Sequence, residues 1–142
     1  SVGLYIAIAS VVGLVGPALA TRLREYAGAA RSAVLGMILS GLVTYGIVVT
    51  GNQYFYISMI IVWPLIYYFS IPLIMGIATE LDSKGRVAAA SAGALQLAYS
   101  LGPVVAGFIY EKGGQNVIGN VTLAAMFVSV LLLLLACTRL TK

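Results

Sequence analysis

Five long runs of apolar residues, none of which contains a charged side chain, dominate this sequence. They cover approximately residues 1–20, 32–50, 54–78, 87–110 and 117–137. A helix needs about 20 mostly apolar residues to cross the roughly 30 Å hydrocarbon core of a bilayer, and each run is close to that length. A membrane β-barrel would instead show segments of about 10 residues that alternate apolar and polar side chains. The continuous runs therefore predict five membrane-spanning helices.

The overall composition agrees with a protein that lies in lipid. Hydrophobic residues make up 61% of the 142 positions and charged residues only 8%, and the mean hydropathy is +1.05. A soluble domain carries about 25% charged residues, so this chain cannot cover a water-exposed surface. We expect an all-α, polytopic transmembrane helical bundle whose main partner is the lipid bilayer.

Several kinds of chemistry are excluded by the residues that the chain lacks. There is no histidine and one cysteine, Cys137, so neither an imidazole site nor an internal disulfide is available. No acidic residue lies inside an apolar run, which leaves general acid–base catalysis without its usual side chains. We therefore expect neither an enzyme nor a metal or organic cofactor.

Lysine and arginine are distributed unevenly between the two sides of the predicted bundle. If each run crosses the membrane once, one side holds a single basic residue, Lys112, and the opposite side holds the other seven: Arg22, Arg24, Arg31, Lys84, Arg86, Arg139 and Lys142. Basic loops stay in the cytoplasm, so the C-terminus is expected there. The net charge of +4 comes from these loop clusters and not from a basic face, so no nucleic acid is expected as a partner.

The stretch TELDSKGRVAAASAGALQLAYSLGPVVAGFIYEKGG resembles the region of the tenth and eleventh helices in major facilitator superfamily transporters. The matching positions are three in the loop and three in the following helix: Asp82, Gly85, Arg86, Gly102, Pro103 and Gly107. A looser similarity covers GPALATRLREYAGAARSAVLG, where Arg22, Gly28 and Arg31 match a loop motif of the same family. The aspartate of that motif is absent, and Thr21 stands near its place.

The resemblance implies a fold and a function. With residues 1–20 as the eighth helix, the chain would be helices 8–12 of 12, a partial C-terminal half of a major-facilitator fold in the cell (inner) membrane. Such a protein is a secondary carrier that moves a small organic solute by alternating access, in uptake or in efflux, together with its N-terminal half. The rival interpretation is a small, non-transporting membrane protein with a structural or assembly role.

Candidate site residues lie in the third run. Trp63, Tyr67 and Ser70 are spaced by four and three residues, so they share one face of a helix. In the family that the chain resembles, this helix lines the central cavity. An aromatic wall with hydroxyl groups suits an amphiphilic solute or an organic cation held against ring faces. The alternative is that these aromatic residues serve packing or the membrane interface.

The fourth run adds Gln96 and Ser100 as candidate substrate contacts, while Tyr5 and Ser10 of the first run are secondary candidates. A buried amide is costly in lipid and often marks a transport path, although a hydrogen bond between helices would also explain it. A strip of small residues on the same run, which includes Gly102, Pro103 and Gly107, is expected to serve helix packing, bending or gating.

The loop after the third run carries opposite charges. Asp82 and Arg86, together with Arg22 of the first loop, are expected to form a cytoplasmic latch whose ion pairs change between transport states. The alternative is a solvated loop without a specific role.

Overall fold

The computed structural model describes residues 2–82 and 84–140, and in that part of the chain all regular structure is helical. Lys142, one of the basic residues counted above, lies outside it. The helices are α1 (Val2–Gly13), α2 (Val15–Ala27), α3 (Ala29–Val49), α4 (Gln53–Leu81) and α5 (Arg86–Leu140). Among the described residues, four helical segments are long and apolar enough to cross a membrane: Gly3–Ala27, Ala29–Val49, Gln53–Leu81 and Arg86–Thr138.

The first membrane segment consists of two helices, α1 and α2, which are separated at Leu14. Pro17 has no backbone N–H, so the carbonyl of Gly13 loses the hydrogen bond that a continuous helix would give it. The backbone at Leu14 nevertheless stays in the right-handed helical region, with φ −62° and ψ −22°. The segment also continues to Ala27, through residues 21–27 that we predicted as loop, and only Gly28 separates it from α3.

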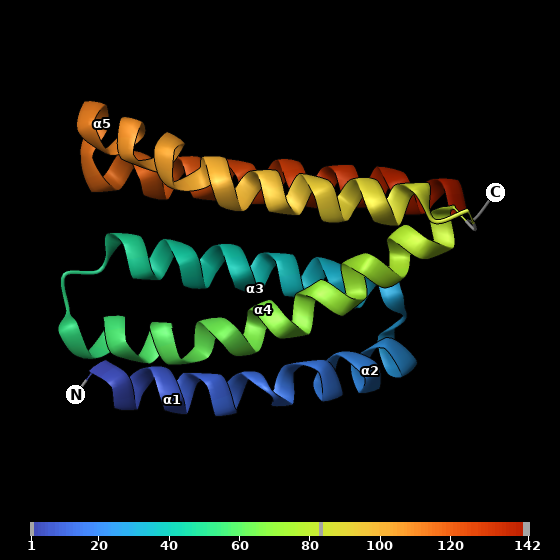
Figure 1. Ribbon diagram of the computed structural model, residues 1–142, viewed down its shortest axis with the longest axis horizontal. Coiled ribbons are helices and arrows are strands. Elements are labelled where there is room, and N and C mark those ends of the chain that lie inside the picture. The colour runs from blue at the N-terminus through green and yellow to red at the C-terminus, as the bar shows by residue number, and fades with distance from the viewer. Residues whose placement is uncertain (1, 83, 141–142) are drawn as a thin grey trace.

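The longest helix, α5, reverses direction at Gly114. This residue has φ 69° and ψ −168°, a conformation that glycine adopts without the steric cost of a Cβ atom. Figure 1 shows the chain turning back at this point, so that the second arm (115–140) returns to the end where the first arm (86–113) begins. The predicted runs 87–110 and 117–137 correspond to these two arms, but the expected loop at 111–116 is helical except for Gly114.

Helix α4 is the centre of the bundle, since it contacts α1, α2, α3 and α5. It begins at an N-cap, Asn52, whose Oδ1 accepts hydrogen bonds from the backbone N–H groups of Tyr54 (2.9 Å) and Phe55 (3.3 Å). The buried core joins α4 to its neighbours through Ala20, Ala33, Phe69, Leu73 and Ile77.

Glycines set how closely the helices approach. A Cβ atom added at Gly16 of α2 would lie 2.6 Å from the carbonyl oxygen of Leu65, and one at Gly36 of α3 would lie 2.6 Å from Oγ of Ser70. On the other face of α3, a Cβ at Gly41 would clash with Met126 of the second arm of α5. Helices α2, α3, α4 and this arm therefore pack through small residues, as membrane helices commonly do. The second arm thus has one packed stripe, while most of its side chains are exposed, which agrees with the expectation that the last helix mostly faces lipid.

The first arm of α5 is packed much less tightly than the other helices. A Cβ atom added at Gly102 or Gly107 would meet no atom within 4 Å, and Pro103 between them is exposed. Gly102 and Gly107, which we expected to pack against another helix, therefore have open space beside them. The helix also continues through Pro103.

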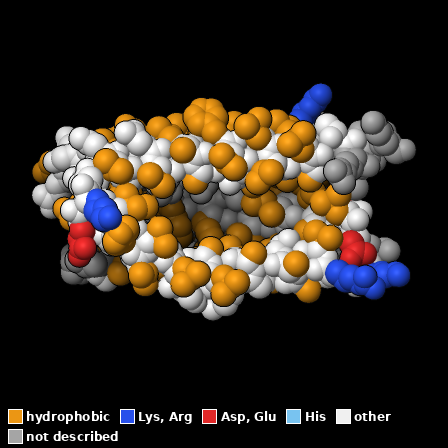
Figure 2. Space-filling model, turned by 90° about the horizontal axis from the view of Figure 1, so that it is seen from above, with side chains coloured by type: hydrophobic (Ala, Val, Ile, Leu, Met, Phe, Trp, Pro, Cys, Tyr) orange, Lys and Arg blue, Asp and Glu red, His pale blue; other side chains and the backbone are white. Residues whose placement is uncertain are grey.

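Charged side chains gather at the two ends of the molecule, as Figure 2 shows, with hydrophobic side chains between them. The end of α2, the connection from α4 to α5 and the end of the second arm lie together at one end, while the α3–α4 connection and Gly114 lie at the other (Figure 1). Arg22, Arg24, Arg31 and Arg86 are therefore at the end opposite to Lys112, which agrees with the predicted segregation of basic residues.

Candidate functional site

Four aromatic side chains meet where α4 approaches the first arm of α5, and we call them the aromatic cluster: Trp63, Tyr67, Tyr68 and Tyr99. The rings of Trp63 and Tyr67 are stacked, with centroids 5.2 Å apart and planes at 14°. Tyr68 lies edge-on to Tyr67 at 5.3 Å, and Tyr99 lies 6.4 Å away, with its hydroxyl group hydrogen-bonded to that of Tyr67. Tyr67 is thus the centre of the cluster and its link to α5.

A cavity of about 500 Å³ borders this cluster. Its lining comes from three helical segments, namely the junction of α1 and α2, α4, and the first arm of α5: Ser10, Leu14, Trp63, Pro64, Tyr67, Tyr68 and Tyr99. Trp63 is 37% exposed, so part of its ring is accessible. The hydroxyl of Ser10 donates to the carbonyl of Ile6 at 2.9 Å and keeps its lone pairs as acceptors.

A second cleft, of about 300 Å³, lies on another side of Tyr67, between α3, α4 and the second arm of α5. It is lined by several hydroxyl groups, which belong to Ser40, Thr44, Tyr67, Ser70, Thr122 and Ser129. Ser70 is buried and donates to the carbonyl of Ile66 at 2.7 Å, and Thr122 donates to the carbonyl of Ile118 at 3.0 Å. Their lone pairs therefore offer acceptors to a polar group that enters the cleft. Seen from the α5 side, the molecule is hollowed along its long axis (Figure 2).

The structure separates the predicted site residues into groups. Trp63 and Tyr67 share the aromatic cavity, whereas Ser70 lies in the second cleft, which Tyr67 also lines. Gln96 and Ser100 are exposed on the first arm of α5, where Oγ of Ser100 donates to the carbonyl of Gln96 at 3.1 Å. Helical spacing places both on the side of the arm that carries Tyr99.

Two parts of this region were missed by reasoning from the sequence. Tyr99 follows Gln96 by three residues, so it lies on the same face of the helix as Gln96, and the prediction for Gln96 could have included it. The hydroxyl pairs of the second cleft also have helical spacing: Ser40 and Thr44 are four residues apart, and Thr122 and Ser129 are seven. This spacing could have predicted a row of hydroxyl groups on one face of each helix.

The predicted latch is replaced by a different set of contacts. The carboxylate of Asp82 accepts hydrogen bonds from the backbone N–H groups of Lys84 (2.9 Å) and Arg86 (3.0 Å), so it caps the start of α5. Among the described residues the ion pair at this end joins Arg24 of α2 to Glu80 of α4. The carboxylate of Asp82 is thus occupied by neighbouring backbone N–H groups, and Arg22 lies at the edge of a separate groove described below.

Metal binding finds no support within the described residues, where no three histidine, cysteine, aspartate or glutamate side chains gather. Comparison of the chain with protein-family models, curated protein sequences and solved structures gave no significant match.

Proposed function

We propose that this chain is the C-terminal part of a major-facilitator-type secondary carrier, helices 8–12 of 12, that moves a small organic solute across the cell (inner) membrane. The observation that carries the proposal is the aromatic cavity between helices, which shares Tyr67 with a separate cleft lined by several hydroxyl groups. Small-molecule sites have volumes of about 300–1,000 Å³ and combine apolar walls with a few polar groups.

The arrangement of the helices supports the same proposal. The segment formed by α1 and α2, then α3, α4 and the two arms of α5 run alternately in opposite directions (Figure 1). With each of them taken as one span, the chain crosses the membrane five times, and the basic end faces the cytoplasm together with the C-terminus.

The chemistry of the cavity indicates a class of solute. Ring faces carry a negative potential that attracts organic cations, and the stacked pair of Trp63 and Tyr67 leaves part of the indole accessible. The hydroxyl groups of Ser10 and Tyr99 lie in the same lining. We expect the solute to be amphiphilic, with an aromatic or cationic part.

The loose packing of the first arm of α5 fits a carrier that changes its shape. Alternating access requires helices to move against one another around a fixed site. The arm 86–113 reaches α4 at the hydrogen bond between Tyr99 and Tyr67, while Gly93, Gly102 and Gly107 have no neighbours within 4 Å of an added Cβ atom. Such an arm loses little packing when it moves.

The test combines a binding measurement on this chain with a transport measurement, in proteoliposomes, on the carrier that includes its N-terminal half. Trp63 is the sole tryptophan of these 142 residues, so in the binding measurement its fluorescence reports the cavity directly, with tetraphenylphosphonium as an aromatic cationic probe. Because an aromatic contact contributes about 0.5–1.5 kcal/mol, Trp63→Ala should weaken uptake of the probe roughly two- to tenfold. Gln96→Ala tests whether the first arm of α5 contributes to uptake of the probe.

Tyr54→Ala is the matched control, because Tyr54 belongs to the same helix but is 83% exposed at its start. Uptake that is unchanged in both Trp63→Ala and Gln96→Ala would retire these residues as a substrate site. If the wild-type protein also shows no saturable quenching and no uptake, the rival function as a non-transporting structural protein gains support. The close glycine contacts of α2, α3 and α4 are the observation that favours that rival.

A further inference from the structure

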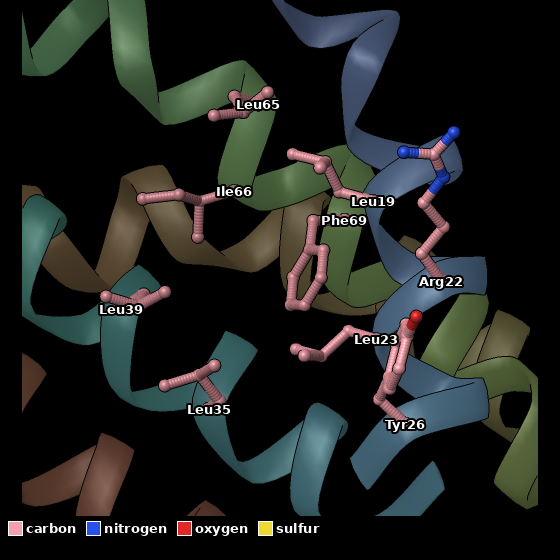
Figure 3. Close-up of a pocket in the computed structure, with 9 residues that line it drawn as sticks. All are labelled: Leu19, Arg22, Leu23, Tyr26, Leu35, Leu39, Leu65, Ile66 and Phe69. Carbon is pink, nitrogen blue, oxygen red and sulfur yellow. The ribbon is translucent and has the colours of Figure 1, made fainter. Parts of the chain in front are cut away.

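An apolar groove of about 330 Å³ lies between α2, α3 and α4, away from the aromatic cavity. Figure 3 shows leucines of α2 and α3 on its two walls and Phe69 of α4 between them. The floor is buried, since Ile66 and Phe69 are 7% and 8% exposed, whereas Leu35 and Leu39 are 44% and 37% exposed. The groove is therefore open on one side and lined by branched and aromatic side chains.

The groove itself is lined almost entirely by apolar atoms, but two of its lining residues at one end have polar groups at their tips. Arg22 and Tyr26 lie four residues apart on α2, in the stripe that also includes Leu19 and Leu23. Tyr26 is 90% exposed and Arg22 is also exposed. In Figure 3 the guanidinium group of Arg22 is directed away from the leucines, as expected for a side chain whose stem covers apolar surface while its charge reaches the aqueous boundary.

The two arginines of α2 are used differently. Arg24 pairs with Glu80, and its guanidinium group passes Gly76, where a Cβ atom would lie 2.9 Å away. Among the described residues Arg22 makes no ion pair, not even with Glu25 one turn further along α2. The charge at the rim of the groove is therefore not neutralised within the described part of the chain.

We propose that this groove binds an anionic phospholipid. One acyl chain lies along the leucines, and the headgroup phosphate accepts hydrogen bonds from the guanidinium group of Arg22 and the hydroxyl of Tyr26. Leu19 to Tyr26 spans about 10 Å at 1.5 Å per residue, so the lined part begins at the basic end and extends toward the middle of the bundle. Basic pockets between transmembrane helices on the cytoplasmic side are suited to anionic headgroups.

The lining argues against a protein helix as the occupant. Helices in this chain meet through glycines, at Gly16 between α2 and α4 and at Gly36 between α3 and α4, because small residues permit close approach of backbones. The groove offers no glycine, and its walls are leucines. A thin, flexible hydrocarbon chain fits between such side chains more readily than a second backbone does.

The experiment uses the full chain in nanodiscs that contain equal amounts of phosphatidylglycerol and phosphatidylcholine. Native mass spectrometry after mild detergent release measures the ratio of the two lipids that remain bound. A basic residue near the surface is worth about 1 kcal/mol toward anionic lipid, so Arg22→Gln should lower the preference for phosphatidylglycerol about fivefold. Arg31→Gln is the matched control, because Arg31 is an exposed arginine at the same end but does not line the groove.

A second variant fills the groove and keeps the charge. Leu39→Trp should remove the tightly retained phosphatidylglycerol while leaving the folded protein and Arg22 in place, with folding checked by circular dichroism. Equal losses in Arg22→Gln and Arg31→Gln would overturn the proposal, because they would indicate a general effect of surface charge. Retention that is unaffected by Arg22→Gln would also overturn it, as would a lipid-free dimer in which the groove is protected. If Leu39→Trp does not fold, the comparison of Arg22→Gln with Arg31→Gln decides whether the groove binds the lipid.

Discussion

Replacing Gly16 by alanine should separate α2 from α4. At Gly16 the two backbones touch, because an added Cβ atom would lie 2.6 Å from the carbonyl oxygen of Leu65 and 2.8 Å from the backbone nitrogen of Phe69. Both are main-chain atoms of a long helix, so no change of side-chain rotamer can relieve the overlap. Ordinary van der Waals contact begins at 3.4 Å, and α2 would have to move by roughly 0.8 Å.

The size of the effect follows from two opposing contributions. Overpacking of this kind costs about 1–3 kcal/mol, and a rigid backbone partner favours the upper part of that range. Alanine also stabilises a helix interior by about 1 kcal/mol relative to glycine. The free energy of unfolding of Gly16→Ala should therefore fall by about 1–2 kcal/mol.

Gly93→Ala provides the control, because an added Cβ atom at Gly93 meets nothing within 4 Å, so only the gain in helix propensity remains. Unfolding by sodium dodecyl sulfate in mixed micelles, followed by circular dichroism, gives the stability of both variants. If Gly16→Ala is as stable as Gly93→Ala, the close approach of α2 and α4 is wrong.

Two further substitutions test single contacts. Gly76→Ala should push aside the guanidinium group of Arg24, whose nearest nitrogen would lie 2.9 Å from the new Cβ atom. Because the side chains of Arg24 and Glu80 are both more than 40% exposed, the loss in free energy of unfolding should stay below about 1 kcal/mol. In a double-mutant cycle this loss should not add to the loss caused by Glu80→Gln. Tyr99→Phe removes the hydrogen bond between the hydroxyl groups of Tyr99 and Tyr67 and should lower the stability of the first arm by about 0.5–1.5 kcal/mol. The measurement is amide hydrogen exchange, which should become faster along 86–113. Exchange that speeds up equally in all helices would contradict a local link.

The apolar runs predicted long apolar helices, because lipid requires long helices of uncharged residues. Five spans were predicted, whereas the described residues form four segments long enough to span, because the last two runs belong to one helix, α5. The ends of the helices were less predictable. Residues 21–27 carry charges, and we took them as loop, but leucine, arginine, glutamate and alanine all favour helix. A change from apolar to charged residues marks the boundary of the membrane, whereas a helix ends where its backbone changes conformation, as at Gly28 and Gly114.

The candidate site was only partly predictable for a related reason. Spacing within α4 placed Trp63 and Tyr67 on one face, and they do meet. Spacing cannot give the rotation of α5 about its own axis relative to α4, so Tyr99 was missed although it neighbours Ser100. At the basic end, opposite charges suggested ion pairs for Asp82, but the N–H groups at the start of α5 were closer partners.

The glycines of this fold have two different surroundings, and the difference is relevant to the proposed carrier. Gly16, Gly36 and Gly41 each exclude a Cβ atom because another helix occupies that space, so they fix α2, α3, α4 and the second arm of α5 as one tightly packed unit. Gly102 and Gly107 have open space beside them, so at these positions the same residue type leaves the first arm without close contacts. A loosely packed arm and a tightly packed unit are thus built from similar sequence, and the difference between them is whether another helix lies beside the glycine. Because the hydrogen bond from Tyr67 to Tyr99 joins the two, a solute that displaces it would loosen the arm at the cavity itself.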